Sequence, residues 1–143
     1  MNPDKPAYVL DSYAMLAYLN GEAGQERVQD ILTQAQSGKA DVFLGMINLG
    51  EIMYIVERRR GLTQAQRTLS LIESLPLILC DTTQALVLDA AHIKAGHAIS
   101  YADAFVVALA QTETAIVLTG DPEFETMAEE VSIEWLGLAQ RVI

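Results

Sequence analysis

The chain has 143 residues, of which 51% are hydrophobic, and its formal net charge is −10. That length suits one domain spanning residues 1–143, and the apolar content excludes a disordered chain. The acidic balance argues against a broadly basic nucleic-acid surface, although it leaves room for a local basic site.

The sequence shows no signal region and no membrane span, which favours a cytoplasmic protein. Residues 1–6 contain no apolar signal region, and the longest apolar stretch, 104–110, is too short to span a bilayer, so we expect no membrane contact. The single Cys80 follows three aliphatic residues, which predicts a buried thiol in a reducing compartment. With one cysteine and two histidines, we do not expect a structural zinc site.

Short apolar runs alternate with helical patterns along the chain. A strand at 8–10 precedes helices at 14–19 and 22–36, and a strand at 42–46 precedes a helical pair at 49–60 and 64–75. A strand at 77–80, helices at 84–95 and 101–111, a strand at 115–118, a helix at 123–129 and a strand at 133–136 follow. The alternation predicts an α/β fold with a parallel sheet covered by helices. The continuous apolar runs at 77–80 and 115–118 are typical of strands buried on both faces.

Four carboxylates occur where an apolar strand gives way to a helix: Asp11, Glu51, Asp103 and Asp121. Strand ends that lead into helices share one edge of a parallel sheet, where ligands bind in open α/β folds. Carboxylates that gather there without basic partners repel one another, which implies a bound cation. Oxygen ligands suit Mg²⁺ or Mn²⁺, and such ions assist hydrolysis of phosphodiesters.

Each acid also has an interpretation as a helix cap. The segments 48–51 and 100–103 match a capping box, in which the acid bonds back to the amide of the capping residue. Asp11 suits the cap of the helix that follows it, and Asp121 before Pro122 has the pattern of an N-cap. Asp81, which also follows an apolar run, we interpret as a plain cap because no apolar stripe begins there.

Two details favour inward-facing acids over caps. Asp103 heads an apolar stripe that continues through Val106, and Glu51 lies one turn from Ile47. A carboxylate that faces a core needs a partner. The neighbouring sequence offers no lysine or arginine at matching spacing except Arg58, so a divalent cation is the economical partner.

These motifs resemble the PIN-domain nucleases, specifically the VapC-type toxins of bacterial and archaeal toxin–antitoxin pairs. The matching segments come in the family's order and cover nearly the whole chain: Val-Leu-Asp-Ser at 9–12, Ile-Asn-Leu-Gly-Glu-Ile at 47–52, Ser-Tyr-Ala-Asp-Ala-Phe at 100–105, and Thr-Gly-Asp-Pro-Glu-Phe at 119–124. The resemblance implies a three-layer α/β/α sandwich whose parallel sheet of four or five strands has the order 3-2-1-4-5.

The resemblance also implies roles for single residues. It puts four acids on the family's metal-site positions: Asp11, Glu51, Asp103 and Asp121. The three aspartates would bind Mg²⁺ or Mn²⁺ directly or through water, and Glu51 would bind metal or orient the attacking water. Ser12 and Thr119 match small hydroxyl positions beside the site. Tyr13 departs from the pattern, since many relatives carry a small polar residue there.

The implied activity is a metal-dependent endoribonuclease, the toxin of a type II pair, with a small antitoxin and a second copy of the chain as partners. The RNA target differs between relatives and does not transfer. The basic cluster Arg58, Arg59 and Arg60 lies about 10–13 Å along the helix from Glu51, at 1.5 Å per residue, which suits contact with a flanking RNA phosphate. A solvated helix C-terminus is the alternative for these arginines.

Other functions stay open at this point. A phosphatase with an aspartyl nucleophile after the first strand usually has a second acid two residues on, where this chain has Tyr13. A receiver-like domain phosphorylated on an aspartate would have an acidic pair near the first strand and a lysine after a late strand. A PIN fold that has lost catalysis and only binds partners would not need all four acids.

Overall fold

The computed structural model describes residues 5–137, and all five strands of this region form one parallel sheet. The strands are β1 (Ala7–Leu10), β2 (Asp41–Gly45), β3 (Ile78–Cys80), β4 (Ile116–Thr119) and β5 (Ile133–Trp135). They lie in the order β3-β2-β1-β4-β5, so the predicted order 3-2-1-4-5 is confirmed. The strand order reverses between β1 and β4: β2 and β3 lie on one side of β1, and β4 and β5 lie on the other. Open α/β sheets bind ligands at such a switch point.

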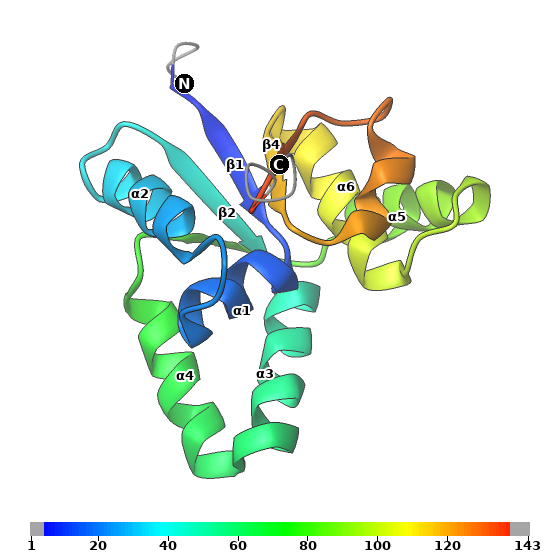
Figure 1. Ribbon diagram of the computed structural model, residues 1–143. Coiled ribbons are helices and arrows are strands. Elements are labelled where there is room, and N and C mark those ends of the chain that lie inside the picture. Colours follow the sequence, from blue (N-terminus) through cyan, green and yellow to red (C-terminus); the bar gives the residue numbers. More distant parts are fainter. Residues whose placement is uncertain (1–4, 138–143) are drawn as a thin grey trace.

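Helices cover both faces of the sheet (Figure 1). One face carries α1 (Ser12–Asn20), α2 (Gln25–Gln36), α3 (Met46–Arg60) and α4 (Leu62–Ser74). The other face carries α5 (Gln84–Gly96), α6 (Tyr101–Glu113) and the 3₁₀ helix η1 (Pro122–Met127). Successive strand residues point to opposite faces, so Leu10 of β1 packs in the first core and Val9 in the second.

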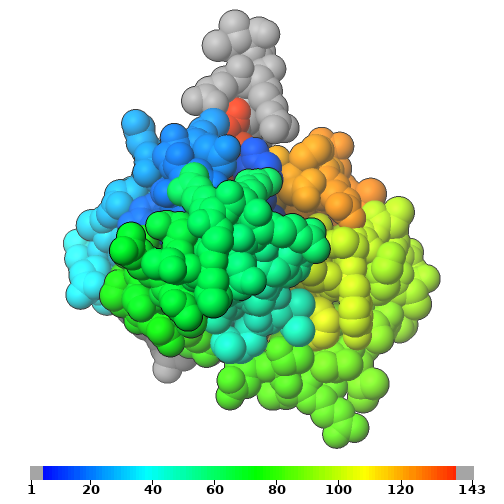
Figure 2. Space-filling model, turned by 90° about the horizontal axis from the view of Figure 1, so that it is seen from below, coloured from blue at the N-terminus to red at the C-terminus, as the bar shows by residue number. Residues whose placement is uncertain are grey.

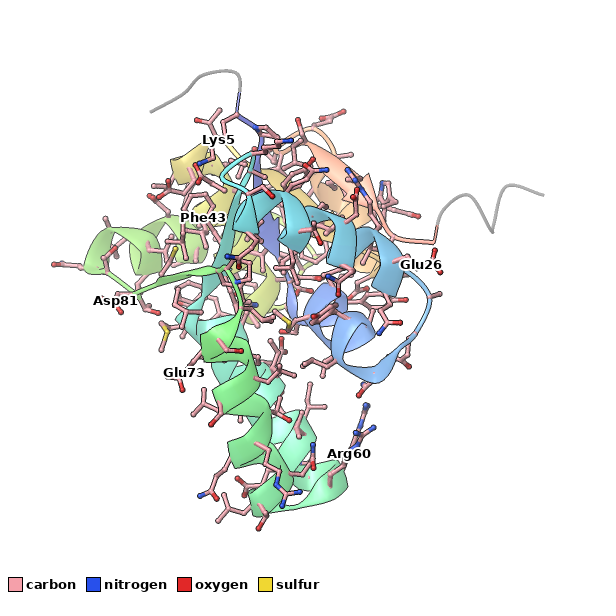
Figure 3. The ribbon with its side chains drawn as sticks, turned by 90° about the vertical axis from the view of Figure 1, so that its left-hand side faces the viewer. Lys5, Glu26, Phe43, Arg60, Glu73 and Asp81 are labelled. Carbon is pink, nitrogen blue, oxygen red and sulfur yellow. The ribbon has the colours of Figure 1, made fainter. Side chains whose placement is uncertain are left out.

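The α3–α4 pair extends away from the sheet (Figure 1) and stands in front of the other elements when the molecule is seen from below (Figure 2). Gly61 joins the two helices with a φ of +89°, a conformation that glycine adopts without a steric penalty. The break predicted at this residue is therefore confirmed. Arg60 lies at the far end of the pair, away from the sheet (Figure 3).

β3 does not have the environment that its sequence suggests. The strand lies at the edge of the sheet, and Ile78 is 45% exposed, so the expectation of a strand buried on both faces was wrong. Cys80 is half-buried for the same reason. Continuous apolar character cannot separate a central strand from an edge strand, because both alternate their side chains between two faces.

Three local features also differ from the predictions: the start of α3, the type of the helix after Asp121, and the residue that caps α5. β2 ends at Gly45 and α3 begins at Met46 without a loop, three residues before the predicted start. The segment after Asp121 forms a 3₁₀ helix rather than an α-helix. Asp81, labelled in Figure 3, is exposed, and Thr83 caps α5 by accepting from the N–H of Leu86 at 3.1 Å, so the interpretation of Asp81 as a cap was wrong.

Within residues 5–137, no single helix is long and apolar enough to cross a membrane. α5 and α6 pass the length and composition criteria only when counted together, and they are bent by 118° at their junction. The expectation of no signal region at residues 1–6 falls largely on residues 1–4, which lie outside the described part of the chain.

Candidate metal centre

The ends of β1 and β4 are joined at Asp11. Its Oδ1 accepts from the N–H of Ala14 at 2.8 Å, which caps α1, and its Oδ2 accepts from the hydroxyl of Thr119. Asp11 is 2% exposed and Thr119 is fully buried. A buried carboxylate that accepts two hydrogen bonds is fixed in orientation. Asp11 is therefore both a helix cap and a candidate oxygen ligand for a metal at the carboxyl edge of the sheet.

Asp103 lies in the first turn of α6, but its carboxylate does not complete the predicted capping box. Ser100 caps the helix by accepting from the N–H of Asp103 at 3.2 Å. The reciprocal bond, from the N–H of Ser100, goes to Oε1 of Glu123 at 2.6 Å instead. Asp103 is 8% exposed and is followed by buried Val106, so the predicted inward direction of this stripe is confirmed.

Asp121 is also a cap, as predicted. It accepts from the N–H of Glu123 at 3.0 Å at the start of η1, with Pro122 as the first helical residue. Its own N–H donates to the Thr119 hydroxyl at 3.0 Å, which connects it to the same group that holds Asp11. Capping and ligand binding are compatible here, because a carboxylate has lone pairs beyond the one that a cap uses.

Carboxylate oxygens of Asp103, Asp121 and Glu123 all lie within 4.8 Å of one another. Glu123 was not among the predicted site residues. Its place two positions after Asp121 was the available signal, because η1 turns it back toward the N-terminus of α6. Its contact with Ser100, 23 residues away, has no local pattern in the sequence.

Glu51 reaches the same edge from α3. The hydroxyl of Ser12 donates to Oε1 of Glu51. Because Gly45 is the N-cap of α3, the capping box expected at 48–51 does not form, and Asn48 instead donates to the carbonyl of Ala102 at 3.3 Å. Ile47 is 38% exposed, so the predicted apolar inner face one turn before Glu51 was wrong, and Glu51 itself is half-buried.

Burial and mutual repulsion change the protonation of two of these acids. Burial raises the pKa of Asp11 to about 7, against the lowering effect of its hydrogen bonds from Thr119 and Ala14, and the charges of Asp103 and Asp121 add to the rise. Burial likewise raises the pKa of Asp103 to about 7, against the lowering effect of its hydrogen bond with Ser100, and the charges of Glu123, Asp121 and Glu51 add to the rise. The acids are therefore close enough to destabilise one another's charged forms.

The donor set fits a hard divalent cation. In the described part of the chain, no lysine, arginine or histidine nitrogen lies within 4.0 Å of a carboxylate oxygen of these acids. The groups that converge are carboxylates and hydroxyls, without thiol or imidazole. Mg²⁺ and Mn²⁺ prefer such oxygen ligands, and Asp103, Asp121 and Glu123 are the residues that could hold one ion together.

A profile of the PIN domain family matches residues 8–130 of the sequence. The chain belongs to the PIN domain family. Proteins of the PIN and VapC family are nucleases, a class of hydrolase. No curated protein sequence matches this PIN domain significantly.

Solved structures share the fold of this PIN domain. VapBC2 from Rickettsia felis, bound to a fragment of its promoter DNA, has a TM-score of 0.72 and 18% identity, covering 91% of this chain and 98% of that one. DNA-bound VapBC from Salmonella typhimurium has a TM-score of 0.70 and 19% identity, covering 90% and 97%. VapC20 from Mycobacterium tuberculosis, a toxin that cleaves the sarcin–ricin loop, has a TM-score of 0.66 and 18% identity, covering 82% and 92%.

The arginine cluster of this PIN domain is exposed at the end of α3. The Arg58 guanidinium lies 5.2 Å from the ring centroid of Tyr54, and Arg60 donates to Oδ1 of Asn20 at 3.3 Å. Arg58, Tyr54 and Glu51 are spaced at four and three residues, so they follow one face of the helix toward the acidic edge. None of the three arginines forms an ion pair within residues 5–137.

Proposed function

We propose that this PIN domain is a metal-dependent endoribonuclease that hydrolyses RNA phosphodiester bonds. The observation that carries the proposal is the meeting of Asp103, Asp121 and Glu123 within 4.8 Å, beside buried Asp11, with no cationic side chain to balance them in the described residues. A divalent ion bound there would neutralise phosphate oxygens and lower the pKa of a bound water.

The protein groups have distinct roles in this proposal. Asp103, Asp121 and Glu123 would hold Mg²⁺ or Mn²⁺, and Asp11 would bind the ion directly or through water. Glu51, oriented by the Ser12 hydroxyl, positions the attacking water. Thr119 fixes Asp11 and the backbone of Asp121 together, so the carboxylates are arranged before any ligand arrives.

We further propose that the chain is the toxin of a type II toxin–antitoxin pair, that it acts in the cytoplasm as one domain, and that it forms homodimers. The support is the fold shared with two VapBC structures over at least 90% of this chain. An antitoxin is accordingly the expected protein partner, and RNA the expected substrate.

The test is cleavage of a structured RNA by the purified protein with Mn²⁺ and with chelator. We expect cleavage in Mn²⁺, none in chelator, and none for Asp103→Asn, with exposed Asp81→Asn as a control that stays active. Cleavage that persists in chelator and in Asp103→Asn would overturn the metal mechanism. Hydrolysis of p-nitrophenyl phosphate without RNA cleavage would favour the phosphatase alternative.

A further inference from the structure

The ring of Tyr13 packs directly on the backbone of Gly120. A Cβ atom at position 120 would lie 2.3 Å from Cε1, 2.7 Å from Cζ and 3.0 Å from Cδ1 of Tyr13, and the first two distances are shorter than real Cβ contacts. Gly120 is not among the glycines with positive φ, so backbone conformation does not require a glycine there. A side chain at this position would instead force the tyrosine ring to move.

This contact lies at the rim of the acidic edge. Gly120 stands between Thr119, which holds Asp11, and Asp121. Tyr13 follows Asp11 by two residues and is 40% exposed. One side of the ring is therefore fixed against the backbone beside the acids, and a large part of the rest is open to solvent.

Other exposed tyrosines near the acids are already engaged. Tyr54 is 50% exposed, but Arg58 lies over its ring at 5.2 Å. Tyr101 is 45% exposed, and its ring centroid lies 4.9 Å from that of Phe105. Among residues 5–137, Tyr13 has no such aromatic or cationic partner.

We propose that Tyr13 is a stacking platform for an unpaired nucleobase next to the phosphate that is cleaved. The inference rests on the proposed ribonuclease function and deepens it, because it assigns a base-binding residue beside the acids that the proposed mechanism does not use. Unstacked bases in such RNA bind the faces of aromatic side chains. A ring that is already held by Gly120 loses little conformational freedom when a base stacks on it.

The test measures binding rather than cleavage, so it is independent of catalysis. The probes are an unstructured ten-nucleotide RNA of mixed sequence and a chain of the same length and charge that carries abasic residues. Affinity is measured with Ca²⁺ in place of Mn²⁺, and gels verify that the strands stay intact. We expect wild type to prefer the base-containing strand by about five- to a hundred-fold, the range of one stacked base.

Tyr13→Phe keeps the ring and should keep that preference, whereas Tyr13→Leu should remove most of it without a change in affinity for the abasic strand. Gly120→Ala should displace the ring, and its effect should not add to that of Tyr13→Leu. Equal binding of both strands by wild type, full preference in Tyr13→Leu, or an equal loss in Tyr13→Phe would overturn the proposal. A protein that shows the preference but cleaves no RNA would overturn the proposed function and leave Tyr13 as a base-binding residue without a catalytic context.

Discussion

The backbone N–H of Ser100 donates to the carboxylate of Glu123 at 2.6 Å, so the helix that carries Asp103 is capped from another segment of the chain. In an ordinary capping box, the acid in the first turn would take that bond itself. Because Glu123 takes it, the carboxylate of Asp103 is left to face Asp121 and the other acids. Glu123 therefore leaves the carboxylate of Asp103 available to a ligand.

Two substitutions at Glu123 should separate its cap from its charge. Glu123→Gln keeps an acceptor for Ser100, whereas Glu123→Ala removes it, so only the alanine variant should lose about 0.5–1.5 kcal/mol of unfolding free energy, the net value of one hydrogen bond. Both should weaken Mn²⁺ binding if the carboxylate is a ligand. Urea unfolding and calorimetric Mn²⁺ titration measure the two effects. Unaltered Mn²⁺ affinity in Glu123→Gln would remove Glu123 from the ligand set.

Asp103→Asn should raise the melting temperature in chelator and abolish the increase that Mn²⁺ produces in wild type. Two carboxylates about 4 Å apart repel by roughly 4 kcal/mol at an effective dielectric near 20, and the amide removes one of the charges while keeping the shape. Asp81→Asn, on an exposed loop, should keep the wild-type response. If Asp103→Asn retains the full Mn²⁺ response, Asp103 is not a ligand.

Without metal, protonation of the acids should favour the folded state. Asp11 and Asp103 have pKa values of about 7 in the folded protein, against an ordinary value of 3.8, so the folded state binds more protons between these pH values. Their contribution is fully present below pH 3.8 and is lost as the pH rises through about 7. One isolated shift of this size is worth about 4 kcal/mol, and repulsion shared between the two acids makes their sum smaller than twice that.

The measurement is the unfolding free energy of wild type and Asp103→Asn in chelator between pH 4 and pH 8. We expect wild type to lose stability more steeply than the variant over this range, because the variant lacks one of the two groups and relieves the other. Parallel curves would show that Asp103 titrates at its ordinary pKa.

Replacement of Arg58 and Arg59 by glutamine should weaken RNA binding and flatten its dependence on salt. Each phosphate contact to a single strand contributes about 0.7 to the slope of log affinity against log salt, so loss of both contacts should lower the slope by about 1.4. Lys94→Gln, an exposed cation on α5, serves as the control. An unchanged slope in the double variant would leave the arginines as a solvated helix end.

A cognate antitoxin should compete with Mn²⁺ for the acidic edge. We expect it to insert an arginine or lysine among the carboxylates, because that cation would relieve the same repulsion as the metal. Addition of Mn²⁺ should then lower the affinity of the antitoxin for this protein, which a titration of complex formation at increasing Mn²⁺ concentration measures. An affinity that is independent of Mn²⁺ would indicate that the antitoxin blocks the RNA path elsewhere.

Sequence patterns could predict the order and type of the elements because each pattern reports a local property. Apolar runs located every strand, and Gly61 located the break between α3 and α4. The start of α3 was misplaced because Asn48 looks like a cap, whereas its side chain bonds across the fold to Ala102. A contact of that kind leaves no trace in the neighbouring sequence.

The same distinction applies to the acidic edge. Asp11 and Asp121 could be predicted to converge because both follow strands that the order implied by the family resemblance places side by side, as observed. The spacing of Glu123 from Asp121 was the only signal for its place in the cluster, because its contact with Ser100 depends on the 3₁₀ geometry of η1. The raised pKa of Asp11 likewise depends on complete burial, which only the assembled fold provides.

The bond between Thr119 and Asp11 joins residues 108 positions apart. During synthesis, a chain released as far as the end of α6 already carries Asp11, Glu51 and Asp103, but β4 and Asp121 are still missing. Asp121 and Glu123 can join Asp11, Glu51 and Asp103 only after β4 docks beside β1. A chain that ends before β4 therefore lacks Asp121 and Glu123, two of the three acids that could hold one ion together.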